Sequence, residues 1–250
     1  MSVKPREHWT LLHSFDFVAI GAGSPPALSD GEITIDGKTV RIGGTANAAD
    51  WEIGASGLKY TKSASAASAL EILGTDLVAD FALGDVIWMA SAWNCPDDLN
   101  TTDGSRFMIG FGSGGQIVPT YAGSQYLIGG NQYDSGQMNI RGLADDVNGS
   151  SGEANLVAGS GTVTHLGMLM HGRQGQIEYG SPSTFPTRPG QPGMTRLGPL
   201  CGGRLPSQGE TMTTANTRLY AEFAAFGGGG AWTGYLERLE FYRLEGGLGL

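Results

Sequence analysis

The stretch GYLERLEFYRL, from Gly234 to Leu244, decides the fold because its apolar residues follow two different periods. Leu236 and Leu239 lie three residues apart, as on a helix, whereas Leu239 and Phe241 alternate, as on a strand. A three-residue step followed by a two-residue step is what a β-bulge produces, because one extra residue resets which side chains face the core. The spacing therefore predicts a bulged strand of an all-β protein.

The clearest turn signal is GEITIDGKTVRI, in which Asp36-Gly37 favours a tight hairpin. Pairing Ile35 with Lys38 places Ile33 opposite Val40. This register predicts a buried face and a solvated face. The buried face comprises Ile33, Ile35, Val40 and Ile42, and the solvated face comprises Glu32, Thr34, Thr39 and Arg41.

Other short apolar segments recur along the chain and mostly end at Gly, Asn or Asp, starting with a first strand predicted over LLHSFDFVAI. Glycine supplies 42 of the 250 residues, more than twice the usual fraction of roughly 7%, and there is no Gly-X-Y period. Ten or more strands with almost no helix predict two packed antiparallel sheets. We expect one sandwich domain over residues 1–250, with residues 180–209 as an extended arm or loop insertion.

The formal net charge of −9 lacks the basic footprint that nucleic-acid binding requires. No apolar run reaches the length of a signal peptide or of a membrane span, so we expect synthesis in the cytoplasm and no membrane insertion. The two cysteines, Cys95 and Cys201, are interpreted as free thiols, with a bridge between them as the alternative.

The last third of the chain contains THLGMLMHGRQGQIEYG and then AWTGYLERLEFYRL. This order resembles the concanavalin A-like, laminin-G-type jelly-roll superfamily, and the resemblance spans most of residues 10–245. It implies a two-sheet antiparallel jelly-roll sandwich. GQIEYG lacks the usual Asp-Gly turn, and the proline-rich segment is an addition. The residues that match the pattern of the superfamily are His165, Ile177, Trp232, Gly234, Leu236, Leu239, Phe241 and Tyr242.

Catalytic motifs of this superfamily and of other enzymes are missing from the sequence. The endoglucanases of the superfamily carry Glu-x-Asp-x-x-Glu on one strand, and no such run exists here. Glu71 and Asp76 would point to opposite faces of a strand. The stretch GFGSGG matches a dinucleotide-binding pattern formally, but the following QIVPTY has a proline where a helix should begin. The sequence therefore predicts a protein that is not an enzyme.

The stretch NCPDDLNTTDG offers oxygen ligands of the kind that calcium prefers. The resemblance supports a calcium site, because many members of the superfamily bind calcium on loops at the edge of the sandwich. A plain solvated turn is the alternative, and no other cofactor is expected. The candidate ligands are Asp97, Asp98, Asn100 and Asp103.

Aromatic side chains at predicted strand ends and loops are candidates for stacking on sugar rings, with core packing or loop anchoring as the alternative. These candidate glycan-binding residues are Trp93, Tyr121, Tyr126 and Tyr133.

Residues 180–209 hold six of the 11 prolines, and no acidic residue lies between Glu178 and Glu210. Proline fixes φ and lowers the entropy lost on ordering, so an exposed arm of this kind can bind a partner without a core of its own. We expect the arm to contact a neighbouring subunit, with a plain surface loop as the alternative. The predicted interface residues are the apolar Phe185, Met194 and Leu197 and the basic Arg188, Arg196 and Arg204.

Two functions fit these observations. The first is a non-enzymatic structural or interaction protein of a virion, as a bacteriophage head-decoration or tail component that contacts copies of itself or other virion proteins after synthesis in the host cytoplasm. The alternative is a glycan-binding, lectin-like adhesin that recognises a cell surface.

Overall fold

The computed structural model describes fourteen ranges of the chain, within which lie sixteen strands and one helix. The ranges are residues 8–23, 32–35, 37–44, 50–62, 68–74, 85–94, 105–113, 126–134, 137–144, 154–157, 164–171, 174–196, 217–225 and 231–245. The elements are β1 (His8–Asp16), α1 (Phe17–Ala22), β2 (Glu32–Ile35), β3 (Lys38–Gly44), β4 (Trp51–Gly54), β5 (Gly57–Lys62), β6 (Ser68–Gly74), β7 (Val86–Asn94), β8 (Ser105–Ser113), β9 (Tyr126–Asp134), β10 (Gln137–Ala144), β11 (Ala154–Val157), β12 (His165–His171), β13 (Gln174–Gly180), β14 (Met194–Arg196), β15 (Thr217–Ala225) and β16 (Trp232–Glu245).

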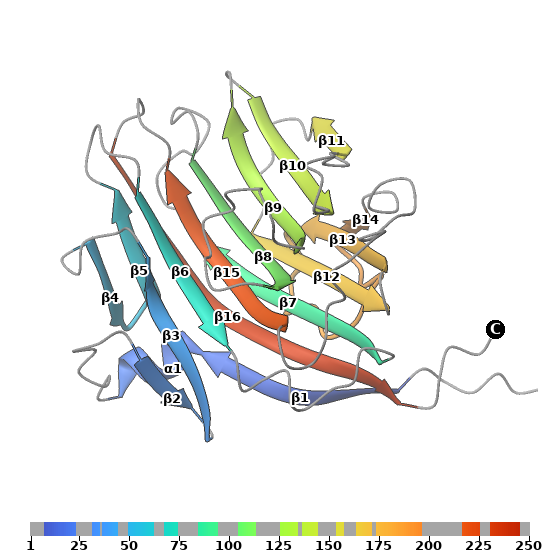
Figure 1. Ribbon diagram of the computed structural model, residues 1–250, viewed down its shortest axis with the longest axis horizontal. Helices are drawn as coiled ribbons and strands as arrows, with labels where there is room; N and C mark the ends of the chain where they lie inside the picture. The colour runs from blue at the N-terminus through green and yellow to red at the C-terminus, as the bar shows by residue number, and fades with distance from the viewer. Residues whose placement is uncertain are drawn as a thin grey trace, which may run out of the picture.

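The strands form two antiparallel eight-stranded sheets that lie face to face (Figure 1). Sheet A has the order β14-β13-β12-β7-β16-β5-β4, and β1 pairs with the C-terminal part of β16. Sheet B has the order β11-β10-β9-β8-β15-β6-β3-β2. This architecture confirms the predicted all-β jelly-roll sandwich.

The bulge predicted in the closing strand is present in β16. The register between β16 and β7 shifts between Leu236 and Arg238, so one extra residue is inserted on β16. Leu236, Leu239 and Phe241 are all buried, as the changed spacing requires. One bulge therefore keeps the side chains before and after it in the same core.

The predicted hairpin forms between β2 and β3 with the expected register. Ile35 pairs with Lys38 and Ile33 with Val40. Val40 is buried, as is Ile42, whereas Thr34 and Arg41 are exposed. The alternation of the sequence thus places β3 with one face toward the core.

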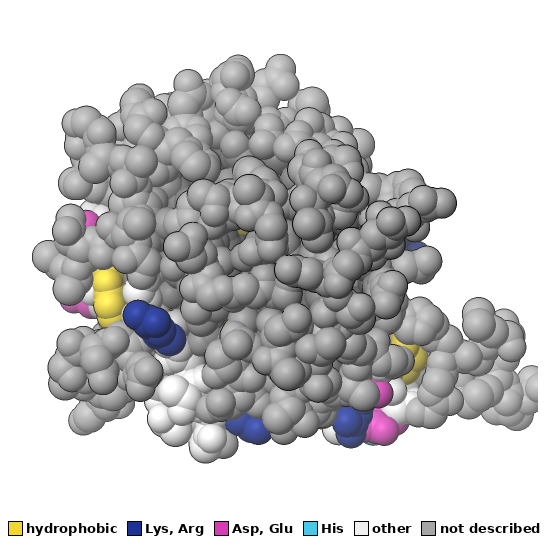
Figure 2. All heavy atoms as spheres, viewed as in Figure 1, with side chains coloured by type: hydrophobic (Ala, Val, Ile, Leu, Met, Phe, Trp, Pro, Cys, Tyr) yellow, Lys and Arg dark blue, Asp and Glu magenta, His cyan; other side chains and the backbone are white. Residues whose placement is uncertain are grey.

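The main core lies between the sheets and is rich in aromatic rings. Trp93 of sheet A stacks on Phe107 of sheet B at 4.8 Å between ring centroids and meets Phe223 edge-on at 4.8 Å. Tyr60 stacks on Phe223 at 5.7 Å. In the view of Figure 2, described hydrophobic side chains reach the surface in small separate areas.

The first strand is shorter than predicted, because β1 ends at Asp16 and α1 follows. The Asp16 carboxylate accepts a hydrogen bond from the Ala19 N–H at 2.9 Å, as an N-cap residue does. A Cβ on Gly21 would lie 1.8 Å from the Gly54 carbonyl oxygen, so glycine lets α1 approach β4 closely. Within the described ranges, no helix has the length and apolar character needed to cross a membrane.

Candidate functional site

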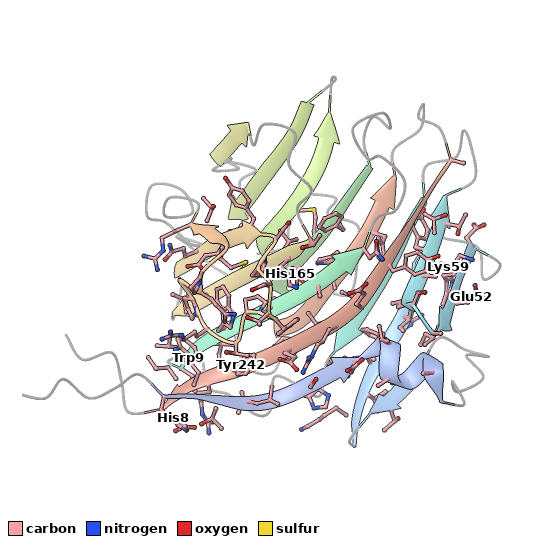
Figure 3. All side chains as sticks on the ribbon, turned by 180° about the vertical axis from the view of Figure 1, so that it is seen from behind. His8, Trp9, Glu52, Lys59, His165 and Tyr242 are labelled. Atoms are coloured by element: carbon pink, nitrogen blue, oxygen red, sulfur yellow. The ribbon has the colours of Figure 1, made fainter. Side chains whose placement is uncertain are left out.

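The face of sheet A that points away from sheet B carries three cross-strand rows of side chains. Each row runs from β16 through β7 to β12. The rows are Tyr242, Trp88 and Leu169; then Glu240, Ala90 and Gly167, extended to Glu178 on β13; and then Arg238, Ala92 and His165. Figure 3 shows Tyr242, His165 and Trp9 on this side of the molecule.

Residues 181–193, which we call the strap, cover part of this outer face. The Trp88 indole Nε1 donates a hydrogen bond to the Pro186 carbonyl oxygen at 2.9 Å. Trp88, Ala90 and Tyr242 are buried, with Trp9, Leu169 and Phe185 packed against them. The strap thus encloses a second, smaller core outside the two-sheet sandwich.

The Trp88 ring needs a glycine beneath it on the neighbouring strand. A Cβ on Gly167 would lie 2.1 Å from the Trp88 Cη2 atom. The absence of a side chain at this position allows the indole to lie across β12 and reach Pro186.

Phe185 of the strap lies between two basic side chains. Its ring centroid is 6.0 Å from that of His165, in an edge-on arrangement, and 4.8 Å from the Arg238 Cζ atom. Ala92 separates Arg238 from His165 in the row, and its small side chain leaves room for the ring. Phe185 is therefore an anchor of the strap on its own chain.

Gln191 holds the strap in shape from within. Its Oε1 accepts a hydrogen bond from the Thr187 N–H at 3.0 Å, and its Nε2 donates to the Thr184 Oγ1 at 2.9 Å and the Phe185 carbonyl oxygen at 3.2 Å. Gly190 and Gly193 have φ angles of 68° and 88°, which favour glycine. The strap is thus a defined turn structure with its own internal bonds.

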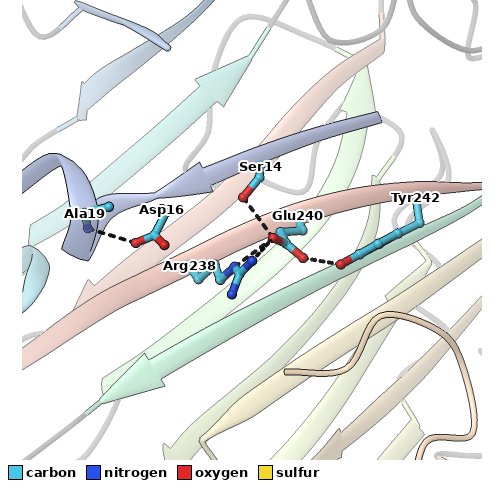
Figure 4. A network of polar contacts seen from close by, with 6 residues as sticks. All are labelled: Ser14, Asp16, Ala19, Arg238, Glu240 and Tyr242. Atoms are coloured by element: carbon cyan, nitrogen blue, oxygen red, sulfur yellow. Dashed lines mark hydrogen bonds and ion pairs between the residues drawn. The ribbon is translucent and has the colours of Figure 1, made fainter. Parts of the chain in front are cut away.

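Glu240 is the centre of a buried polar network (Figure 4), with 1% of its surface exposed. Its Oε1 accepts hydrogen bonds from Arg238 Nε at 2.7 Å and from Ser14 Oγ at 2.8 Å. The Tyr242 hydroxyl donates to its Oε2. Burial, and then the hydrogen bond to Glu240, raise the pKa of Tyr242 well above its ordinary value, so this hydroxyl keeps its proton.

Glu178, also 1% exposed, joins the strap to β13. Its Oε2 accepts a hydrogen bond from the Gly190 N–H at 2.7 Å, and its Oε1 accepts one from Arg196 Nε at 3.4 Å. Glu178 and Glu240 lie three strands apart in one row, which places their Cα atoms about 14 Å from each other. Each carboxylate is thus held in an ion pair with an arginine, Glu178 with Arg196 and Glu240 with Arg238.

His165 is a partly buried titratable residue that contacts Phe185 of the strap. Its Nδ1 lies 2.8 Å from the Thr164 Oγ1, and burial lowers its pKa below the ordinary value of 6.5. The unfolded chain then binds more protons than the folded chain as the pH falls below that ordinary value. The stabilising contribution of neutral His165 is complete above this pH and is lost as the pH falls through the folded pKa.

We expect the midpoint of thermal unfolding to fall by a few degrees between about pH 7.5 and about pH 5. His165→Gln should make that dependence weaker, because the side chain no longer titrates. Thermal melts followed by circular dichroism at several pH values measure the effect. The control is His8→Gln, which changes an exposed histidine and should leave the slope unchanged. Equal slopes for all three proteins would contradict the prediction.

The predicted interface residues within the described ranges are partly exposed or fully exposed. Phe185 is half-buried and packs on the outer face of sheet A. Met194 and Arg196 belong to β14, which pairs with β13. Arg188 is exposed. Leu197 and Arg204 lie outside the described residues.

Of the candidate sugar-stacking residues, Trp93 is the one whose side chain the structure describes. Trp93 is 2% exposed in the main core, which corrects its expected place at a surface site. Tyr126 and Tyr133 lie on β9, where the structure describes the backbone alone, and Tyr121 lies outside the described ranges.

The proposed calcium ligands also lie outside the described ranges. These are Asp97, Asp98, Asn100 and Asp103. In the part of the chain that the structure describes, no three His, Cys, Asp or Glu side chains are grouped to hold a metal ion.

The fold is an antiparallel jelly-roll sandwich of the concanavalin A-like kind. No protein-family model and no curated protein matches the sequence. Among solved structures, the chain is similar to the CBM2 module of the evolved Dit of Lactobacillus casei BL23 phage J-1, with 10% identity, a TM-score of 0.54, and coverage of 97% of this chain and 99% of that one. It is also similar to the exoplasmic/lumenal domain of VIP36 in its Ca²⁺/Man3GlcNAc-bound form, with 10% identity, a TM-score of 0.54, and coverage of 84% and 85%.

A third similar structure is the bifunctional GH43-CE protein of Bacteroides eggerthii, with 14% identity, a TM-score of 0.52 and 92% of this chain covered. The present chain spans 26% of the length of that protein. At these identities the likeness concerns the fold.

Proposed function

We propose that this protein is a non-enzymatic structural or interaction protein of a viral particle. The observation that carries the proposal is that Glu178 and Glu240, two carboxylates whose side chains the structure shows buried, are both held by hydrogen bonds and ion pairs. Each is bound by an arginine and by further hydrogen-bond donors, and they lie three strands apart. The likeness to a phage Dit module over nearly the whole of both chains supports a place in a virion.

The proposed contacts with copies of the protein or with other virion proteins involve the exposed part of the arm. Arg188 and Arg196 belong to this surface, with Met194, Leu197 and Arg204 as further proposed members. Phe185 remains a further proposed member of this set, although it also packs on sheet A.

Immunogold electron microscopy of particles from the source organism tests the virion proposal. An antibody raised against the purified protein should label intact particles at a fixed position, and mass spectrometry of those particles should detect the chain. Particles without label and without the chain would refute the proposal. Release of reducing ends from polysaccharides, lost in Glu178→Gln or Glu240→Gln while the variant stays folded, would refute the non-enzymatic role.

Glycan recognition at a cell surface is the second candidate function. The observation that favours it is the polar character of the outward side of the strap, where Ser183, Thr184, Thr187 and Arg188 are exposed. The likeness to VIP36, solved with Man3GlcNAc bound, supports it at the level of the fold. Tyr121, Tyr126 and Tyr133 remain proposed stacking residues, and calcium at Asp97, Asp98, Asn100 and Asp103 remains a proposed cofactor.

A further inference from the structure

The strap separates its side chains into an inward set and an outward set. Pro182 and Pro186 are buried, and Phe185 is half-buried against sheet A. Apart from two glycines and Pro192, the exposed residues of the strap and of the strand that follows it carry hydroxyl or guanidinium groups. They are Ser181, Ser183, Thr184, Thr187, Arg188, Thr195 and Arg196.

This outward surface is already ordered in the free protein. Gln191 fixes the turn from within, the Trp88 indole holds Pro186, and Glu178 holds Gly190. A partner that binds here meets a rigid loop, so little conformational entropy is lost on association.

The surface is basic on an acidic protein. No Asp or Glu occurs from Ser181 to Arg196, whereas the chain as a whole has a formal net charge of −9. Arg188 makes no hydrogen bond or ion pair with any described residue, and the Arg196 side chain is 59% exposed. Glu178 binds both the Gly190 N–H and Arg196, so Arg196 lies near the part of the strap that contains Gly190, two residues after Arg188 in the sequence.

The surface lacks the apolar anchors that dominate protein–protein interfaces. Phe185 is used on the chain's own sheet, and Met194 is half-buried. Hydroxyl and guanidinium groups on a rigid loop instead fit a hydrophilic polyanion, because guanidinium groups bind carboxylates and phosphates through paired, charge-assisted hydrogen bonds.

We propose that the outward side of the strap binds an anionic polysaccharide, with Arg188 and Arg196 contacting its carboxylate or phosphate groups and Thr184 and Thr187 its hydroxyls. This inference rests on glycan recognition, the second candidate function. It assigns that recognition to the strap.

Biolayer interferometry with the full-length protein tests the inference. The probes are polygalacturonate, which carries carboxylates, a glycerol-phosphate teichoic acid, which carries phosphates, and neutral dextran. We expect binding to one or both polyanions and none to dextran, weakening as the salt rises from about 50 to about 200 mM. Arg188→Glu should lower the affinity at least about tenfold.

The matched control is Arg41→Glu, which makes the same charge change at an exposed position of β3, in the other sheet. It should leave the affinity within about twofold. Thermal melts should show that both variants are folded, since both side chains are exposed.

Each alternative outcome has a distinct meaning. Equal polyanion binding by Arg188→Glu and the unchanged protein would overturn the strap assignment and leave glycan recognition intact, as would binding to dextran alone. Failure to bind any probe would contradict the inference and glycan recognition together. If Arg188→Glu changes the sedimentation of the protein and not its polyanion binding, the strap is a subunit interface and the inference is wrong.

Discussion

Trp93→Ala should lower the free energy of unfolding by about 3–5 kcal/mol, because it removes a large ring from the centre of the main core. The Trp93 ring bridges the sheets by stacking on Phe107 and meeting Phe223 edge-on. Its Nε1 donates to the Ser91 Oγ at 2.6 Å, so the substitution also removes a buried hydrogen bond. The cavity would lie between two sheets that many strand pairs hold in place, which limits collapse around it.

Urea denaturation followed by circular dichroism measures this loss. The control is Trp51→Ala, which changes a half-buried tryptophan on β4, the edge strand of sheet A. Its loss should be clearly smaller because less of the ring is removed from water in the folded state. A loss below about 1 kcal/mol for Trp93→Ala would place the ring outside the core and restore Trp93 as a candidate for sugar stacking.

Local sequence patterns were sufficient for the parts of the fold that depend on neighbouring residues. The hairpin register follows from the tight turn at Asp36-Gly37, which places Ile33 opposite Val40. The bulge in β16 follows from the changed spacing of Leu236, Leu239 and Phe241, because the inserted residue leaves its mark in the sequence itself.

The helix α1 was missed because its apolar residues continue the pattern of β1. The segment FVAIGA contains Phe17, Val18 and Ile20, which all favour strands. The available signal was Asp16, a residue type that commonly caps helices. Whether Asp16 caps a helix depends on the close approach of α1 to β4 through Gly21 and Gly54, and no local pattern reveals that contact.

The second core on the outer face had one sequence signal. The run VIWMASAW of β7, Val86–Trp93, is apolar except for Ser91 and indicates a strand that is buried on both faces. The strap could not be identified as the covering segment, because the residues beneath it come from three strands far apart in the sequence. These residues are Ala92, Arg238 and His165. The Glu240 network could not be predicted for the same reason, because its members Ser14 and Tyr242 come from opposite ends of the chain.

Removal of Arg238 should be the most damaging single change in the outer-face network. Arg238→Met keeps the length of the side chain and removes its charge, which leaves the Glu240 carboxylate buried without its cation. Breaking a buried ion pair in this way costs about 3–5 kcal/mol. Arg238 is 41% exposed, so water offsets part of that cost, and we expect a loss of about 2–4 kcal/mol.

Lys59→Met is the matched control, because its partner Glu52 is 66% exposed and is solvated when the lysine is removed. The expected loss there is below about 1 kcal/mol. Adding Glu240→Gln to Arg238→Met should recover part of the stability, since the second change removes the unpaired charge. Urea denaturation of the three variants measures these differences.

Equal losses in Arg238→Met and Lys59→Met would contradict the expectation, because they would mean that water solvates Glu240 as freely as it solvates Glu52. The recovery in the double variant identifies the buried charge as the cause, because the contact of Arg238 with Phe185 is missing from both Arg238 variants and cannot account for a difference between them.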